Sequence, residues 1–433
     1  MGKYSKFDLA RGFSEVVDLV NNTLANHHLR VAFMADELAR LEGFDQADRD
    51  LLLVASMLHD IGVIPLGSVV DDLIFETNKD SHARAGYLMV SACPLLRDEA
   101  LIIKYHHTAW ADIGALPEDM RHPARLANLI HLADMVDMQA RMGYGAEKIS
   151  RRVQARSGQA FSPAAAEGMR ELLLDREFLE NLTESAQNLK TEVRPGLMLS
   201  SHETTVFAMM FAGIIDARSS FTATHSTGVA HLALHLHQLA ALPVANESDM
   251  FIAGLLHDIG KMGVPLDLLE KPGQLTDEEF RAVSRHAGLS EKLLASIAGF
   301  ERITPWGAWH HERLNGRGYP NGLSGADIPM EARITAVADV LTALTESRPY
   351  RAGISVEQSL ETILAMAAEG GLDGDVVGLV CDNLEEVNET RRLAQNLAGL
   401  FFKKLGLSMR PASGELTFEP DGCRDPAGPL PFR

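Results

Sequence analysis

FIAGLLHDIG, residues 251–260, is the stretch that decides the fold of this chain. Its apolar residues run at helical spacing into His257 and Asp258, and Gly260 is expected to end the helix. An imidazole beside a carboxylate suits Mn, Fe, Co or Zn better than Ca or Mg. We therefore expect a helical domain that carries metal ligands at the end of a core helix.

The same arrangement occurs in the first half of the chain, where LLLVASMLHD spans residues 51–60. The two His-Asp pairs are 257 − 59 = 198 residues apart, and the other members of the series recur at offsets of 198 to 205 residues. Each half has the order His, His-Asp, His, His-His, Asp. The C-terminal series is His225, His257, Asp258, His286, His310, His311 and Asp339, and the N-terminal series is His27, His59, Asp60, His82, His106, His107 and Asp134. Such a repeat indicates two copies of one structural unit.

Helical periodicity dominates the rest of the sequence as well. Residues 331–347 and 384–406 carry apolar side chains at steps of three and four, strand-like alternation is scarce, and aromatic residues make up only 6%. We predict an all-α protein of two tandem helical bundles, residues 1–190 and 200–406, joined near Pro195 and Gly196. A tail rich in Pro and Gly is expected at residues 407–433.

The composition limits the partners and the compartment. The net charge of 40 − 59 = −19 disfavours nucleic acid polymers and anionic membranes as partners. Three cysteines at wide spacing fit a reducing compartment, and the N-terminus has no apolar signal-peptide core. The apolar run at residues 206–215 is too short to span a bilayer. We expect a soluble cytoplasmic protein.

The C-terminal series holds more ligands than one metal needs. Five histidines and two carboxylates exceed the demand of a tetrahedral ion, but they suit two octahedral ions about 3.5–4 Å apart that share a bridging carboxylate. His225 shares a helix face with Val229 and Leu232 and is expected to point into the core. The nearby histidines are expected to be solvated, although their spacing imitates a metal site; they are His231, His235 and His237.

Longer motifs in the same half carry a family resemblance. They are HDIGK at 257–261, LEKPGQLTDEE at 269–279, HHERLNGRGYPNGLSG at 310–325 and ARITAVADVLTALTESRPYR at 332–351. Residues 221–351 resemble the HD-GYP family, a branch of the HD phosphohydrolase superfamily, which implies a fold of HD-type helical bundles. Family members are phosphodiesterases that open cyclic di-GMP to a linear dinucleotide, in some cases onward to mononucleotides, and one subgroup prefers cyclic GMP-AMP.

The resemblance also implies roles for single residues. The seven members of the C-terminal series match the family's ligands for two divalent ions, iron or manganese, with Asp258 as the bridging carboxylate. Lys261 matches a lysine that contacts the scissile phosphate. Three further residues match those that hold the dinucleotide, namely Tyr319, Arg348 and Arg351.

Two positions depart from the family pattern. Phe221 stands where some members have a glutamate for a third metal, so the resemblance implies a binuclear site. Asn315 stands where aspartate is usual, which we expect to affect only the geometry of the loop.

The N-terminal half resembles a plain HD domain. Val63 replaces the lysine, residues 109–116 contain no glycine-rich loop with a tyrosine, and no arginine pair follows Asp134. Three hypotheses stay open for this half: a metal-retaining regulatory or dimerising domain, a second phosphohydrolase, and a structural relic without metal. His28 and His131 are interpreted as bystanders.

Two alternative functions stay open for the whole chain. A binding module could sense the cyclic dinucleotide without turnover, but Lys261 and the intact ligand series favour an enzyme. A di-iron oxygenase could use the same ligands, but the tyrosine loop and the two arginines suit a phosphorylated ligand. The input signal and the formation of a homodimer stay open.

Overall fold

The computed structural model describes residues 4–20, 26–66, 79–175, 177–189, 197–216, 224–346 and 352–404. Within these ranges the protein is almost wholly helical, and its only strands are the two-residue β1 (Tyr4–Ser5) and β2 (Met198–Leu199). The predicted all-α fold is confirmed. No helix in the described part of the chain is long and apolar enough to cross a membrane.

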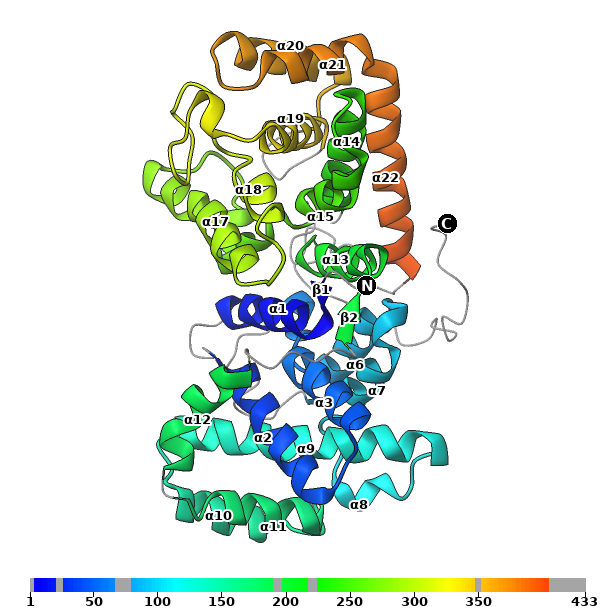
Figure 1. The fold of residues 1–433 in the computed structure, drawn as a ribbon, viewed down its shortest axis with the longest axis vertical. Coiled ribbons are helices and arrows are strands. Elements are labelled where there is room, and N and C mark those ends of the chain that lie inside the picture. The colour runs from blue at the N-terminus through cyan, green and yellow to red at the C-terminus, as the bar shows by residue number, and fades with distance from the viewer. Residues whose placement is uncertain are drawn as a thin grey trace.

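The two halves lie one above the other along the long axis of the molecule (Figure 1). The helices of the first half are α1 (Lys6–Val20), α2 (His27–Glu42), α3 (Gln46–Leu58), α4 (Val63–Leu66), α6 (Lys79–Ser91), η2 (Pro94–Leu96), α7 (Arg97–Tyr105), α8 (Trp110–Ile113), α9 (Glu118–Arg141), α10 (Ala146–Gln154), α11 (Pro163–Leu172) and α12 (Phe178–Asn188).

The helices of the second half repeat this order around their own ligand series. They are α13 (Ser201–Asp216), α14 (His225–Leu239), η5 (Val244–Asn246), α15 (Glu247–Leu256), η6 (Ile259–Gly263), α16 (Leu266–Leu269), α17 (Asp277–Ala295), α18 (Ile303–Ala308), η7 (Gly325–Asp327), α19 (Met330–Thr345), α20 (Val356–Ala368), α21 (Gly374–Asp382) and α22 (Leu384–Lys404).

The helix of the opening motif ends earlier than its sequence predicts. α15 stops at Leu256, so the His-Asp pair lies in the connection to η6, and Gly260 lies inside that short 3-10 helix rather than at the end of α15. The N-terminal copy behaves alike, since α3 stops at Leu58. Both His-Asp pairs therefore sit at a change of chain direction, where the side chains can face a common centre.

A close approach of two backbones explains the glycine in each motif. A Cβ on Gly260 would lie 2.1 Å from the carbonyl oxygen of His286 and 2.5 Å from the amide nitrogen of Ser290, both in α17. A Cβ on Gly62 would meet His82 and Gly86 of α6 at the same two distances. Only glycine lets the turn after the His-Asp pair pack against the helix that carries the next histidine.

Helix α1 joins the two halves. It packs on α3 of its own half and on η6 and α17 of the other (Figure 1). The Tyr4 hydroxyl donates a hydrogen bond to Asp249 (2.6 Å), and the Arg11 guanidinium donates one to the carbonyl of Ser296 (2.6 Å). The two bundles therefore share a packed boundary in addition to the chain connection between them.

Candidate active site

The helices of the second half bring its whole ligand series to one place. The members are His225 at the start of α14, His257 and Asp258 between α15 and η6, His286 in α17, His310 and His311 after α18, and Asp339 in α19. All except the half-buried His311 are buried. Their donor atoms group as His225, His257 and Asp339, as His257, Asp258 and His310, and as His286, His310 and His311.

Asp258 lies at the centre of this cluster. One of its oxygens, Oδ2, is 3.1 Å from Nε2 of His257 and 3.7 Å from Nε2 of His225. The other oxygen, Oδ1, is 3.3 Å from Nε2 of His286 and 3.8 Å from Nε2 of His310. Each oxygen of the carboxylate therefore faces a different pair of histidine nitrogens.

The histidine rings are oriented by contacts on the side away from the cluster. Nδ1 of His257, of His286 and of His310 each donates to a backbone carbonyl three residues earlier, at 2.7–2.8 Å. Their Nε2 atoms are buried without a hydrogen bond. Buried unpaired nitrogens are costly, and a histidine held in this way is typical of a metal ligand. The donor set therefore fits divalent metal ions.

The protonation states of His310 and Asp258 suit metal binding, whereas that of His225 reflects the nearby carboxylates. Burial lowers the pKa of His310 to about 3, which keeps the ring neutral. Burial alone would raise the pKa of Asp258, but His257 and Lys261 hold it well below its usual range. Burial opposes a charge on His225, yet Glu346 and Asp339 raise its pKa to about 10. Ionised carboxylates among buried side chains favour a bound cation, and binding of a metal ion would displace the proton from His225.

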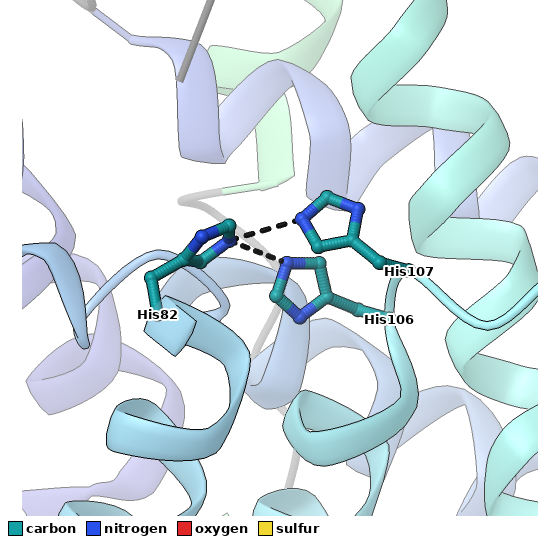
Figure 2. A group of neighbouring side chains, drawn as sticks. All are labelled: His82, His106 and His107. Carbon is teal, nitrogen blue, oxygen red and sulfur yellow. Dashed lines mark hydrogen bonds between the residues drawn. The ribbon is translucent and has the colours of Figure 1, made fainter. Parts of the chain in front are cut away.

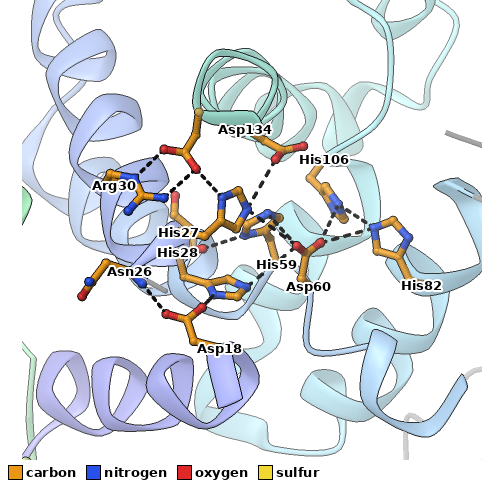
Figure 3. Close-up of polar contacts among 12 residues, drawn as sticks. Asp18, Asn26, His27, His28, Arg30, His59, Asp60, His82, His106 and Asp134 are labelled. Carbon is orange, nitrogen blue, oxygen red and sulfur yellow. Dashed lines mark hydrogen bonds and ion pairs between the residues drawn. The ribbon is translucent and has the colours of Figure 1, made fainter. Parts of the chain in front are cut away.

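The first half repeats this geometry around Asp60. Its Oδ2 lies 3.4 Å from Nε2 of His59 and 3.8 Å from Nε2 of His27, and its Oδ1 lies 3.5 Å from Nε2 of His82 (Figure 3). Nε2 of His27 is also 3.4 Å from Oδ1 of Asp134. The predicted N-terminal series therefore comes together as well.

Three histidines of the first half turn the same ring atom toward one point. Nε2 of His82 lies 3.2 Å from Nε2 of His106 and 3.0 Å from Nε2 of His107 (Figure 2). The equivalent histidines of the second half, His286, His310 and His311, form the matching group. Convergent nitrogens of this kind can bind one metal ion.

Comparison with known proteins agrees with this duplicated geometry. HD-domain profiles match residues 24–139 and 209–376. The 3'3'-cGAMP-specific phosphodiesterase 1 of Vibrio cholerae is 32% identical over 391 residues, which are 86% of this chain and 90% of that protein. The chain belongs to the HD-GYP family of phosphodiesterases.

Two further comparisons extend this result. A cyclic di-GMP phosphodiesterase of Pseudomonas aeruginosa is 38% identical over 147 residues, 34% of this chain and 36% of that protein. A crystal structure of a cyclic GMP-AMP-specific phosphodiesterase of V. cholerae has the same fold, with a TM-score of 0.63 and 22% identity over 88% of this chain and 98% of that chain.

The residues predicted to act beside the metals are partly described. In this HD-GYP protein, Nζ of Lys261 contacts Oδ2 of Asp258. The ring of Tyr319 lies 4.7 Å from that of His311 and borders the ligand cluster. Arg348 and Arg351 lie outside the described residues, and so does Phe221.

The tyrosine loop, residues 315–325 around Tyr319, is held by a buried glutamate. Both carboxylate oxygens of Glu312 accept backbone N–H bonds, from Asn321 at 2.6 Å and from Leu323 at 2.9 Å. Asn315 donates to the carbonyl of Glu369 (3.0 Å) and accepts from the amide of Arg317 (3.1 Å). The residue that departs from the family pattern thus lies in the loop and fastens it to the end of α20.

The first half has no equivalent of this loop in the part that the structure describes. The short helix α8 follows its His-His pair. Val63 begins α4 at the position that matches Lys261. The ligand series is therefore kept in both halves, whereas among the described residues the lysine and the tyrosine predicted to contact a dinucleotide occur only in the second.

Sequence reasoning missed the partners of the first histidine in each half. Nδ1 of His225 contacts Glu346 (2.9 Å), and Nδ1 of His27 contacts Asp137 (2.7 Å). Both carboxylates follow the last aspartate of their series: Asp137 comes three residues after Asp134 in α9, and Glu346 comes seven residues after Asp339, directly after the end of α19. The nearby position in the sequence could have indicated them.

The histidines farther along α14 also differ from the prediction. His237 is buried and contacts the carbonyl of Pro243 at 3.2 Å, so the expectation that it is solvated is wrong. The ring of His237 lies against the loop that follows α14. The buried residues of this helix cover a wide face, which includes His237. His231 packs edge-on against Phe251, with ring centroids 4.8 Å apart, and His235 contacts Glu386 at 3.6 Å.

Proposed function

We propose that the C-terminal half hydrolyses cyclic di-GMP or cyclic GMP-AMP to a linear dinucleotide, with two divalent ions, iron or manganese, as cofactors. The ions would be held by the seven residues of the C-terminal series. Divalent ions supply Lewis-acid charge and lower the pKa of water, which is the chemistry that phosphodiester hydrolysis needs.

The observation that carries this proposal is the position of Asp258. Its two oxygens face separate pairs of histidine nitrogens at 3.1–3.8 Å. Two atoms that bind one ion at about 2.1 Å lie about 3–4 Å apart, so the spacing suits one ion on each side of the carboxylate. The names of the relatives support the substrate class, since they include phosphodiesterases of both cyclic dinucleotides.

Other residues would bind and orient the substrate. The ammonium of Lys261 lies beside Asp258 and would stabilise the negative charge that builds up on the phosphate oxygens. Tyr319 lies at the edge of the cluster, where its ring would contact a base. From the family resemblance, Arg348 and Arg351 would hold the second phosphate or stack on a guanine.

The test is a product assay with metal-loaded protein. Protein reconstituted with Mn(II), or with Fe(II) under anaerobic conditions, is incubated with cyclic di-GMP and separately with cyclic GMP-AMP, and the products are separated by chromatography. We expect a linear dinucleotide from at least one substrate. Asp258→Asn, which keeps the size of the side chain, should remove turnover and about two ions per chain. Metal-loaded protein that binds the nucleotide without converting it would instead be a sensor.

A further inference from the structure

His28, which the sequence suggests is a bystander, points into the N-terminal ligand cluster. It is the second residue of α2, and its side chain is fully buried. Its ring lies between Asp18 of α1 and Asp60 (Figure 3). Nδ1 is 2.7 Å from Oδ1 of Asp18, and Nε2 is 3.8 Å from Oδ2 of Asp60.

The repeat shows what is special about this position. The counterpart of His28 is Ser226, and that of Asp18 is Asp216, each 198 residues later. In the second half the Ser226 hydroxyl donates to Asp216 at 2.7 Å. The side chain of Ser226 is too short to reach beyond Asp216. His28 makes the equivalent contact to Asp18 with Nδ1, and its second nitrogen, Nε2, lies near the ligand cluster.

The contact with Asp18 orients the ring of His28. Nδ1 is taken up by the carboxylate of Asp18, so Nε2 is the ring nitrogen that is left to face Asp60. That nitrogen is buried and makes no hydrogen bond. A lone pair facing a carboxylate oxygen is repulsive unless a cation lies between them. His59 is held in the same way, with Nδ1 at 2.8 Å from the Ser56 carbonyl and Nε2 without a hydrogen bond.

The spacing around Asp60 fits one ion with these nitrogens as ligands. Its Oδ2 lies 3.4 Å from Nε2 of His59 and 3.8 Å from Nε2 of both His27 and His28. These separations match those of atoms bound to one ion at about 2.1 Å. At the C-terminal cluster two histidines and the ammonium of Lys261 face the equivalent oxygen.

We propose that His28 is a metal ligand of the N-terminal centre. With it, protein atoms supply five donors to the ion beside Asp60, and they come from His27, His28, His59, Asp60 and Asp134. Sites filled by protein ligands are typical of structural ions, whereas hydrolytic ions keep an open position. With His28 as a ligand, the ion beside Asp60 has one protein donor more, and so one open position fewer, than the ion beside Asp258 would have. Asp18 connects this site to α1, the helix that packs on the C-terminal half.

The test measures metal affinity at this centre alone. The full chain with His257→Ala, Asp258→Ala, His286→Ala and His310→Ala serves as the background, because these changes disrupt all three donor groups of the C-terminal half. Co(II) is titrated against a competing chelator, with absorption spectra and elemental analysis as readouts. We expect the background protein to bind Co(II), and His28→Ser, which installs the residue of the other half, to weaken binding roughly 10- to 100-fold and to change the Co(II) spectrum.

A matched control is His122→Ser, which removes an exposed histidine of α9 that contacts Asp48. It should leave the affinity and the spectrum unchanged. Circular dichroism establishes that each variant is folded. Folded His28→Ser protein with the affinity and spectrum of the background overturns the proposal, and so does a background protein that binds no Co(II). If His28→Ser does not fold, Asp18→Ala tests the same ligand by releasing Nδ1, and unchanged affinity there contradicts the proposal.

Discussion

At the scale of single residues, the two halves differ at the position after each His-Asp-Ile-Gly motif. Lys261 contacts the bridging carboxylate in the second half, and Val63 stands there in the first. Lys261→Val copies the other half. Since the ammonium stabilises charge in the transition state, we expect kcat to fall about 10²- to 10³-fold with the metal content unchanged. Steady-state kinetics and elemental analysis check this, and a kcat within a few-fold of the wild type would remove the lysine from the reaction.

Buried histidines predict how the metal-free protein responds to acid. Burial lowers the pKa of His310 to about 3. The unfolded chain, with a histidine pKa of about 6.5, binds this proton first, so stability is lost as the pH falls from about 6.5 to about 3, by about 1.4 kcal/mol per unit. Denaturant unfolding of metal-free protein at several pH values measures this slope. His310→Asn should reduce proton uptake on unfolding by about one, and an unchanged slope would contradict the assignment.

The site residues could be predicted because their order repeats along the chain, whereas their partners could not. The histidine spacing on α14 that resembles a metal site did not indicate one. His231 packs on Phe251, His235 contacts Glu386, and His237 is buried against the carbonyl of Pro243. The proposed role of His28 was not predicted, because it depends on a contact with Asp18, which belongs to another helix. Contacts between elements leave no periodic signal in a sequence.

At the scale of elements, the turn after each His-Asp pair depends on glycine. Gly260→Ala would push η6 away from the backbone of α17 and so displace Asp258 from His286. We expect a loss of about 1–3 kcal/mol in stability, together with weaker metal binding. The control is Gly114→Ala, where a Cβ meets nothing within 4 Å. Denaturation and metal analysis compare the variants, and equal values for both would refute the close-packing explanation.

Helix positions followed from apolar periodicity, but their ends did not. α15 stops at Leu256 because the following pair turns inward, and periodicity continues past that point. Periodicity also gave no sign of the contacts between the two predicted domains. For example, Tyr4 of the first half donates a hydrogen bond to Asp249 of the second, 245 residues away. Such long-range contacts are set by packing and were beyond sequence reasoning.

At the scale of the whole molecule, we expect the two similar bundles to have different tasks. Both keep a buried cluster around a central aspartate. In the described residues, only the second has a lysine against that aspartate and a tyrosine loop beside the histidines. Effective catalysis requires the reacting phosphate to be held in line, so cyclic dinucleotide turnover should belong to the second half alone.

One measurement tests this central claim most directly: cyclic dinucleotide turnover by two double variants, each loaded with metal and verified as folded. His257→Ala with Asp258→Ala should eliminate turnover. His59→Ala with Asp60→Ala should retain most of it, apart from any effect on stability. If the second pair abolishes turnover while the fold and the C-terminal ions remain, the N-terminal half takes part in catalysis and the account is contradicted.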